Sequence, residues 1–159
     1  MSENQMMRLE NKVAMVVGAG QTPGPTMGNG RATAVLFARE GAKVLAVDRD
    51  LDSANETVEI IGNEGGTAYA FEADVTDEVT LKMAVADCMT RWNRLDVLHN
   101  NVGISVTGGD APVTEITVEA FDLIMAVNLR GVVMTCKHAL PVMRAQESGV
   151  ILTISSIAA

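Results

Sequence analysis

Short, largely apolar runs alternate along this chain with longer segments whose apolar residues recur at helical spacing. The apolar runs predict five strands, at residues 13–17, 43–48, 67–72, 95–99 and 150–154. The segments between them predict helices at residues 28–40, 53–63, 78–92 and 115–145. Pro141 lies inside the last segment and should kink that helix or end it early, because proline lacks the backbone N–H that a helix needs.

The order of these elements predicts the fold class. Strands that are apolar throughout, rather than at every second position, are typical of a parallel sheet covered on both faces. We therefore expect an α/β fold of three layers, a Rossmann-type doubly wound parallel sheet, with ligands at the carboxyl ends of the strands. The chain shows no internal repeat or interdomain linker, so residues 1–159 are expected to form a single dinucleotide-binding domain.

A glycine-rich turn follows the first predicted strand. The apolar run leads into Gly18-Ala19-Gly20, and the next helical segment opens with Gly28-Asn29-Gly30. Glycine lets the backbone approach a phosphate closely, and the first N–H groups of a helix point toward an anion placed there. Residues 13–40 therefore predict the cradle of a dinucleotide.

Asp48 ends the second predicted strand, and it predicts which dinucleotide is bound. A carboxylate at this place accepts hydrogen bonds from the ribose hydroxyls and repels a 2′-phosphate, which favours NAD over NADP. Arg49 follows directly and could instead accommodate that phosphate. The alternative for Asp48 is that it only caps the turn before residues 50–52.

Composition and charge narrow the classes of partner. The chain has 159 residues, of which 48% are hydrophobic and 20% charged, as expected for one globular domain. Its net charge of −8 argues against nucleic acid and anionic membranes as partners. Cys88 and Cys136 lack the spacing of metal ligands, so we expect reduced thiols and no metal site. The polar residues 1–11 resemble no signal peptide, and no run of 18 apolar residues occurs, which predicts a cytoplasmic protein.

Further polar or glycine residues follow the later strands. Asp74-Val75 comes after the third strand, Asn100-Asn101-Val102-Gly103 after the fourth, and Ser155-Ser156 after the fifth, while Asn128 lies in the last helix. Together with the glycine turn, these motifs resemble the short-chain dehydrogenase/reductase family in their order and spacing. The resemblance extends from Leu9 to Ala159.

The resemblance implies an NAD(P)-dependent oxidoreductase that transfers a hydride between the nicotinamide and a small alcohol or carbonyl substrate. It implies roles for individual residues as follows: Gly18, Gly28 and Gly30 as the cofactor glycines around Asn29, Asp48 and Arg49 at the ribose, Asp74 and Val75 beside the adenine, and Asn100, Asn101, Val102 and Gly103 as the family's Asn-Asn-Ala-Gly motif with Val102 in place of alanine. Asn128 matches the helix asparagine that holds a water in the proton relay. Ser156, rather than Ser155, matches the serine that hydrogen-bonds the substrate oxygen.

The sequence departs from the family pattern in two places. Gly18 and Gly28 are ten positions apart, six more than in the family, and the added residues include Pro23 and Pro25, which should stiffen a longer loop. The family's Tyr-x-x-x-Lys pair is absent, because the one tyrosine, Tyr69, lies in the third predicted strand. We therefore expect the N-terminal part of an NAD-dependent enzyme, truncated at its C-terminus.

The alternative is a truncated dinucleotide-binding or oligomer-forming module without redox activity. In the family, the helix equivalent to residues 115–145 packs against its copy, so the resemblance implies a homo-oligomer. Residues 150–154 would form an exposed apolar edge strand unless another segment covers them.

Overall fold

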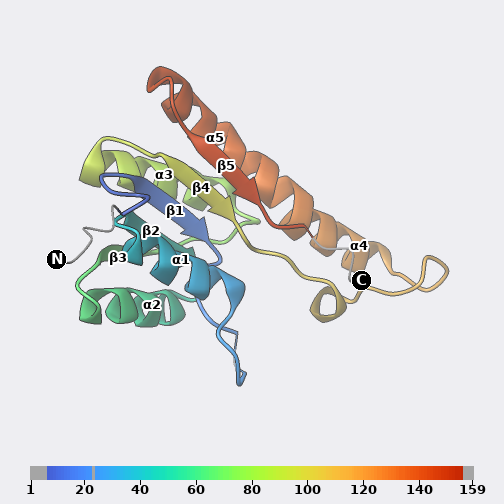
Figure 1. The fold of residues 1–159 in the computed structure, drawn as a ribbon. Coiled ribbons are helices and arrows are strands. Elements are labelled where there is room, and N and C mark those ends of the chain that lie inside the picture. The colour runs from blue at the N-terminus through green and yellow to red at the C-terminus, as the bar shows by residue number, and fades with distance from the viewer. Residues whose placement is uncertain (1–6, 23, 156–159) are drawn as a thin grey trace.

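The centre of the molecule is one sheet of five parallel strands in the order β3-β2-β1-β4-β5 (Figure 1). The structure is a computed structural model, and it describes residues 7–22 and 24–155. The strands are β1 (Val13–Val17), β2 (Lys43–Asp48), β3 (Thr67–Glu72), β4 (Val97–Asn100) and β5 (Val150–Thr153). In register, Val17 pairs with Val47 of β2 and with Asn100 of β4, so the carboxyl ends of the central strands lie at one edge. This arrangement confirms the predicted doubly wound α/β fold.

Helices cover the sheet on both faces (Figure 1). α1 (Asn29–Arg39) and α2 (Leu51–Asn63) pack on one face, and α3 (Glu78–Trp92) and α5 (Gly131–Ala145) on the other. The side chains of β1 alternate between them: Met15 packs with the α3 and α5 residues, whereas Ala14 and Val16 pack with those of α1 and α2. Both faces of a central strand are thus buried, which explains why β1 is apolar at every position.

Several predicted boundaries are wrong by one or two residues, and α1 is one residue shorter at each end than predicted. Helix α2 begins at Leu51 rather than residue 53, because the Asp50 side chain accepts the Ser53 N–H (3.1 Å) and caps the helix. Strand β4 begins at Val97 rather than residue 95 and includes Asn100. Strand β5 ends at Thr153, one residue earlier than predicted.

The long helical stretch of residues 115–145 has an irregularity that the sequence did not predict. It begins at Val118, with Thr117 as its N-cap, and α4 (Val118–Met125) is joined to α5 by the π-helical turn η2 (Ala126–Arg130). Of the two outcomes expected for Pro141, a kink or an early end of the helix, the early end is wrong, because α5 continues to Ala145. Pro141 is exposed, while Ala139 and Met143 on the same helix are buried in the core, and this packing holds the last turn.

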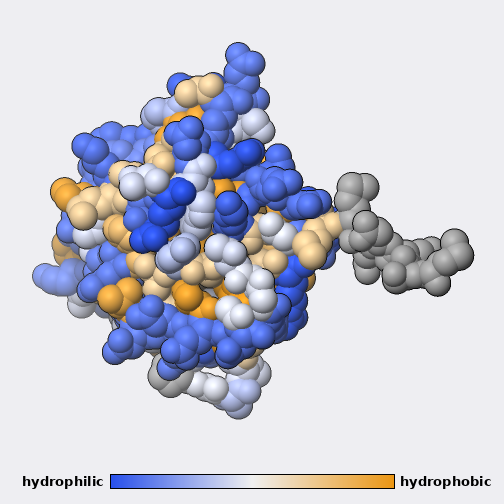
Figure 2. Space-filling model, turned by 90° about the vertical axis from the view of Figure 1, so that its left-hand side faces the viewer, coloured by the Kyte–Doolittle hydropathy of each residue, from blue (hydrophilic) through white to orange (hydrophobic). Residues whose placement is uncertain are grey.

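Apolar side chains are exposed on only part of the surface. The face in Figure 2 is largely hydrophilic, with its apolar residues in small groups. By contrast, the edge strand β5 exposes Val150 and Leu152. None of the helices in the described part of the chain is both long and apolar enough to cross a membrane.

Candidate functional site

The glycine turn crosses the edge of the sheet where β1, β2 and β4 end. Gly18 has a φ of 82°, in the left-handed region that favours glycine. Its N–H donates to the carbonyl oxygen of Val47 (2.8 Å), and the N–H of Ala19 donates to the same oxygen (3.0 Å). The turn is therefore fixed to the end of β2 directly after it leaves β1.

Helix α1 starts in direct contact with this turn. A Cβ atom on Gly30 would overlap the carbonyl oxygen of Gly18, so a residue larger than glycine cannot occupy position 30 without moving the turn. The side-chain amide of Asn101, just beyond β4, donates to that same oxygen (3.3 Å). Gly18, Gly30 and Asn101 thus bring together the ends of β1 and β4 and the start of α1.

The first turn of α1 has the features of an anion site. Gly28 is the N-cap, with extended backbone angles (φ −67°, ψ 151°), and it has no side chain to cap the helix itself. The first turn contains no acidic residue. The N–H groups at the start of α1 and the positive end of its dipole therefore face the glycine turn without a competing negative charge on the helix.

Asp48 lies beside the turn at the end of β2. Its Oδ2 accepts the N–H of Gly20 (2.8 Å), and its Oδ1 accepts the N–H of Asp50 (3.1 Å). These two bonds orient the carboxylate next to the glycine turn and leave it partly exposed. The bond to Asp50 shows that Asp48 also orders the turn before α2, so the two interpretations of Asp48 are compatible.

Asp74 and Val75 follow β3. Hydrogen bonds from the Thr76 hydroxyl (2.6 Å) and N–H (2.7 Å), with a smaller contribution from the charge of Arg49, lower the pKa of Asp74. Arg49 itself is exposed. Asp74 is thus held as a carboxylate near Arg49.

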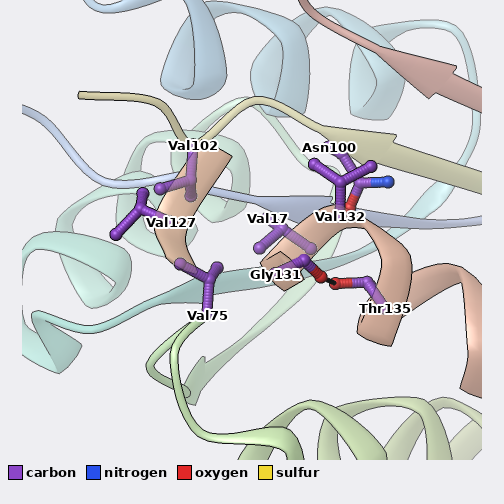
Figure 3. A pocket seen from close by; sticks show the side chains of 8 residues that line it. All are labelled: Val17, Val75, Asn100, Val102, Val127, Gly131, Val132 and Thr135. Atoms are coloured by element: carbon purple, nitrogen blue, oxygen red, sulfur yellow. Dashed lines mark hydrogen bonds between the residues drawn. The ribbon is translucent and has the colours of Figure 1, made fainter. Parts of the chain in front are cut away.

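A small cavity lies between the sheet and the start of α5, the helix that follows η2 (Figure 3). It is lined by Val17, Val75, Asn100, Val102, Val127, Gly131, Val132 and Thr135. Its room is about 10 Å³, on the order of one water molecule. A Cβ atom on Gly131 would lie 2.9 Å from the carbonyl oxygen of Val75, so α5 approaches the segment after β3 closely because position 131 is glycine.

Asn128 lies in η2 and reaches the segment that follows β4. Its Oδ1 accepts the N–H of Ile104 (2.8 Å), and its Nδ2 donates to the carbonyl oxygen of Ile104 (2.7 Å). Gly103 lies alongside, where a Cβ atom would be 3.7 Å from the Asn128 Oδ1. Asn128 therefore ties the long helix to the loop after β4 through both polar atoms of its side chain.

The structure brings most of the predicted residues to one edge of the sheet but not all into mutual contact. Gly18, Gly30, Asp48 and Asn101 surround the glycine turn, whereas Asn128 contacts Ile104. Asn100 is buried, with its amide 3.8 Å from the Cys136 sulfur, and Val102 lines the cavity. Ser156 lies outside the described residues. Burial raises the pKa of Cys88 to about 12, which keeps that thiol protonated.

Four residues that hold the turn could not be predicted from the sequence: Arg31, Ser53, Thr57 and Gln21. Arg31 is buried and donates to the hydroxyl of Thr57 (3.0 Å) and the carbonyl oxygen of Ser53 (3.0 Å), both on α2. The Thr57 hydroxyl donates in turn to the carbonyl oxygen of Ala19 (2.7 Å). The fourth, Gln21, bonds across the turn through its side chain. Only its position next to Gly20 could have drawn attention to it.

The model of the short chain dehydrogenase family matches residues 12–159. The chain belongs to this family. Among curated short-chain dehydrogenase relatives, an uncharacterized oxidoreductase YxbG of Bacillus subtilis is 40% identical over 152 residues, which are 96% of this chain and 52% of the relative. The 2-(R)-hydroxypropyl-CoM dehydrogenase of Xanthobacter autotrophicus is 38% identical over 153 residues, covering 93% of this chain and 57% of the relative.

A solved short-chain dehydrogenase structure has the same architecture. A metagenomic short-chain oxidoreductase in complex with NADP superposes with a TM-score of 0.84 at 29% identity, over 94% of this chain and 64% of that one. The chain spans a little over half the length of the curated relatives described above.

Proposed function

We propose that this chain binds NAD at the edge of the sheet where β1, β2 and β4 end. There it forms the cofactor-binding part of an enzyme that moves a hydride between the nicotinamide and a small alcohol or carbonyl compound. The observation that carries the proposal is the Asp48 carboxylate, which the Gly20 N–H orients beside the glycine turn (2.8 Å).

The residues present fit the cofactor. The close approach of Gly30 to Gly18 brings the start of α1 against the glycine turn, and positions 28 and 30 carry no side chain that would stand between the helix start and a diphosphate. Asn29 and Gly30, the first two residues of α1 after the N-cap Gly28, would hold that diphosphate through their N–H groups. Asp74 and Val75 would flank the adenine, and Asn100, Asn101, Val102 and Gly103 would border the nicotinamide. The bound cofactor supplies the hydride chemistry, and the protein supplies its position.

The choice of NAD over NADP rests on charge. A 2′-phosphate placed near Asp48 would meet a carboxylate that two backbone N–H groups already hold in place. Arg49 is exposed, and its charge acts on Asp74. The metagenomic neighbour contains NADP, so the preference of this chain depends on its own residues at this position.

For the substrate side we propose Ser156 as the residue that donates a hydrogen bond to the reacting oxygen. Both polar atoms of the Asn128 side chain are bonded to the backbone of Ile104. A relay water at this position would therefore bond to the main-chain carbonyl oxygen of Asn128.

We further propose a cytoplasmic homo-oligomer that associates through the helix of residues 115–145. Phe121, Leu129 and Val133 are exposed apolar residues on this helical stretch, and burying them between copies would be favourable.

Calorimetric titration with NADH and NADPH tests the cofactor proposal. We expect saturable binding of NADH and at least about tenfold weaker binding of NADPH. Two like charges about 4 Å apart repel each other by about 1 kcal/mol in water and by about 4 kcal/mol near a protein surface, and tenfold corresponds to about 1.4 kcal/mol. Asp48→Asn keeps an acceptor for Gly20 but removes the charge, and it should narrow this difference.

Asp52→Asn is the matched control, because it makes the same charge change in the first turn of α2, where Asp52 is exposed. It should leave the ratio of the two affinities unchanged. Equal binding of NADH and NADPH by the unaltered chain would refute the NAD preference, and binding of neither would refute the cofactor function.

A further inference from the structure

The side chain of Gln21 closes the lengthened glycine turn on itself. Its Oε1 accepts the N–H of Gly28 (2.7 Å). Its Nε2 donates to the carbonyl oxygens of Thr22 (2.6 Å) and Thr26 (2.8 Å). One carboxamide therefore joins the residues that leave β1 to the residue that begins α1.

The backbone of Gln21 is itself anchored on α2. Its N–H donates to the hydroxyl oxygen of Ser53 (2.7 Å), and that hydroxyl lies 3.4 Å from the carbonyl oxygen of Gln21. Arg31 on α1 donates to both the hydroxyl (3.3 Å) and the carbonyl oxygen (3.0 Å) of Ser53. Gln21 is thus connected to α1 from both sides, through Ser53 and through Gly28.

The bond to Gly28 has a consequence for the start of α1. Gly28 is a flexible N-cap without a side chain, and ordering a glycine backbone costs more conformational entropy than ordering any other residue. Gln21 accepts the N–H of the cap itself and so fixes its extended angles from outside. The Gln21 side chain does not bond to the N–H groups of Asn29 and Gly30, which would be available to an anion at the helix start.

We propose that Gln21 is a positioning residue of the cofactor cradle. It holds Gly28 in place so that the N–H groups of Asn29 and Gly30 are preorganised for a diphosphate. This inference rests on the proposed NAD function and deepens it, because it assigns a role to a residue in the lengthened turn. The effect of Gln21 should therefore depend on whether the ligand carries the diphosphate.

The test compares three probes: NADH, ADP-ribose, and adenosine, which has no phosphate. Gln21→Met fills similar space without hydrogen-bonding groups. We expect this substitution to weaken the binding of NADH and of ADP-ribose about five- to tenfold, which is the size of one or two lost hydrogen bonds, and to leave the affinity for adenosine unchanged. Binding is measured by calorimetry for the dinucleotides and by ligand-observed NMR for adenosine.

Gln146→Met is the matched control. The Gln146 side chain also bridges backbone groups, accepting the Leu95 N–H (3.0 Å) and donating to the Leu95 (2.9 Å) and Ser148 (3.2 Å) carbonyl oxygens. These bonds lie before the start of β4 and after the end of α5, away from the glycine turn. This variant should lose stability as Gln21→Met does, measured by urea unfolding, yet bind all three ligands unchanged.

Amide exchange gives a readout that needs no ligand. Gly28 N–H exchange should be at least about tenfold faster in Gln21→Met than in the unaltered chain, because its acceptor is gone. Unchanged Gly28 exchange, unchanged NADH affinity, or an equal loss for adenosine and ADP-ribose would each overturn the role of Gln21. If the unaltered chain binds none of the ligands, the proposed cofactor function fails, while Gly28 exchange still decides whether Gln21 fixes the helix start.

Discussion

Strands β1 and β5 belong to the same sheet, yet their surroundings differ sharply. Every residue of β1 is at most 2% exposed, whereas Val150 and Leu152 of β5 are 53% and 42% exposed. β1 has a strand on each side and helices on both faces, while β5 pairs with β4 alone. The residues proposed to bind the cofactor gather beside β1, and Ser156, proposed to contact the substrate, comes after β5 in the sequence.

The residues around β1 are held against one another by more contacts than those around β5. Around β1, glycine contacts and hydrogen bonds fix the turn, α1 and the end of β2 against one another. At β5, Ile151 packs toward the α3 and α5 side, but Val150 and Leu152 have little contact on the other side. Substitutions near β1 should therefore cost far more than the same substitutions on β5.

The largest effect is expected for Gly30→Val. The new side chain would overlap the Gly18 carbonyl oxygen, and backbone cannot yield as a flexible side chain can. We expect the free energy of unfolding to fall by about 3 kcal/mol or more, together with loss of NADH binding. Urea unfolding and NADH titration measure the two effects.

Gly62→Ala is the control for this substitution. Position 62 lies in α2, and outside the adjoining backbone of that helix nothing lies within 4 Å of the added Cβ, so alanine should stabilise the helix by up to about 1 kcal/mol. A Gly30→Val variant as stable as Gly62→Ala would mean that α1 does not press on the glycine turn.

A matched pair of leucines probes the difference between the covered and bare strands. Leu98 on β4 is fully buried, and Leu98→Ala should cost about 3 kcal/mol of unfolding free energy. Leu152→Ala on β5 should cost less than about 1 kcal/mol, since its side chain is already partly in water. Equal losses in urea unfolding would show that β5 is covered in solution.

Asp96, just before β4, should contribute less to the free energy of unfolding than Gly30 or Leu98, and its contribution should depend on pH. Burial favours its neutral form most strongly, but hydrogen bonds from Arg94 and the Val13 N–H, with the charges of Arg94 and Lys12, outweigh it and lower the pKa of Asp96. Because the folded pKa lies below the unfolded value of about 3.9, the stabilisation is present above that pH. It is lost as the pH falls through the folded pKa.

Asp96→Asn should therefore cost about 2 kcal/mol at neutral pH and flatten the decline of stability below pH of about 4. Urea midpoints measured from neutral pH down to acid show both effects. A variant whose acid decline matches that of the unaltered chain would exclude Asp96 as its source.

The smallest effect is expected for Val150→Lys. Its exposed side chain on an edge strand should tolerate a charge with less than about 0.5 kcal/mol of change in unfolding free energy. The lysine should also reduce edge-to-edge association, which light scattering would detect. Strong destabilisation instead would mean that another segment packs on β5.

The sequence predicted the strands around the site well and the contacts between segments poorly. Strands β1 to β3 and helix α3 match their predicted bounds, because continuous apolar runs are local signals, as is an aspartate at the N-cap of a helix, here Asp77 before α3. The π-helical turn η2 leaves no such signal, since its register depends on the packing of Asn128 against Ile104. The course of α5 past Pro141 depends likewise on buried neighbours distant in sequence.

The residues of the candidate site likewise fall into those that the sequence predicts and those that only the folded structure shows. The glycines and Asp48 were predictable because each occupies a fixed place relative to a strand end. Gln21, Ser53 and Arg31 were not, because the bonds that hold the turn to α2 join residues far apart in the sequence. The bond between Arg31 and Thr57 spans 26 positions, that between Gln21 and Ser53 spans 32, and that between Ala19 and Thr57 spans 38.

An NMR titration with NAD, followed through the backbone amides, tests the central claim most directly. We expect saturable shifts at Gly18, Asn29 and Gly30, together with Asp48, and unchanged signals along β5. Shifts confined to β5, or no shifts at any NAD concentration up to several millimolar, would contradict a cofactor cradle at the carboxyl ends of β1 and β2.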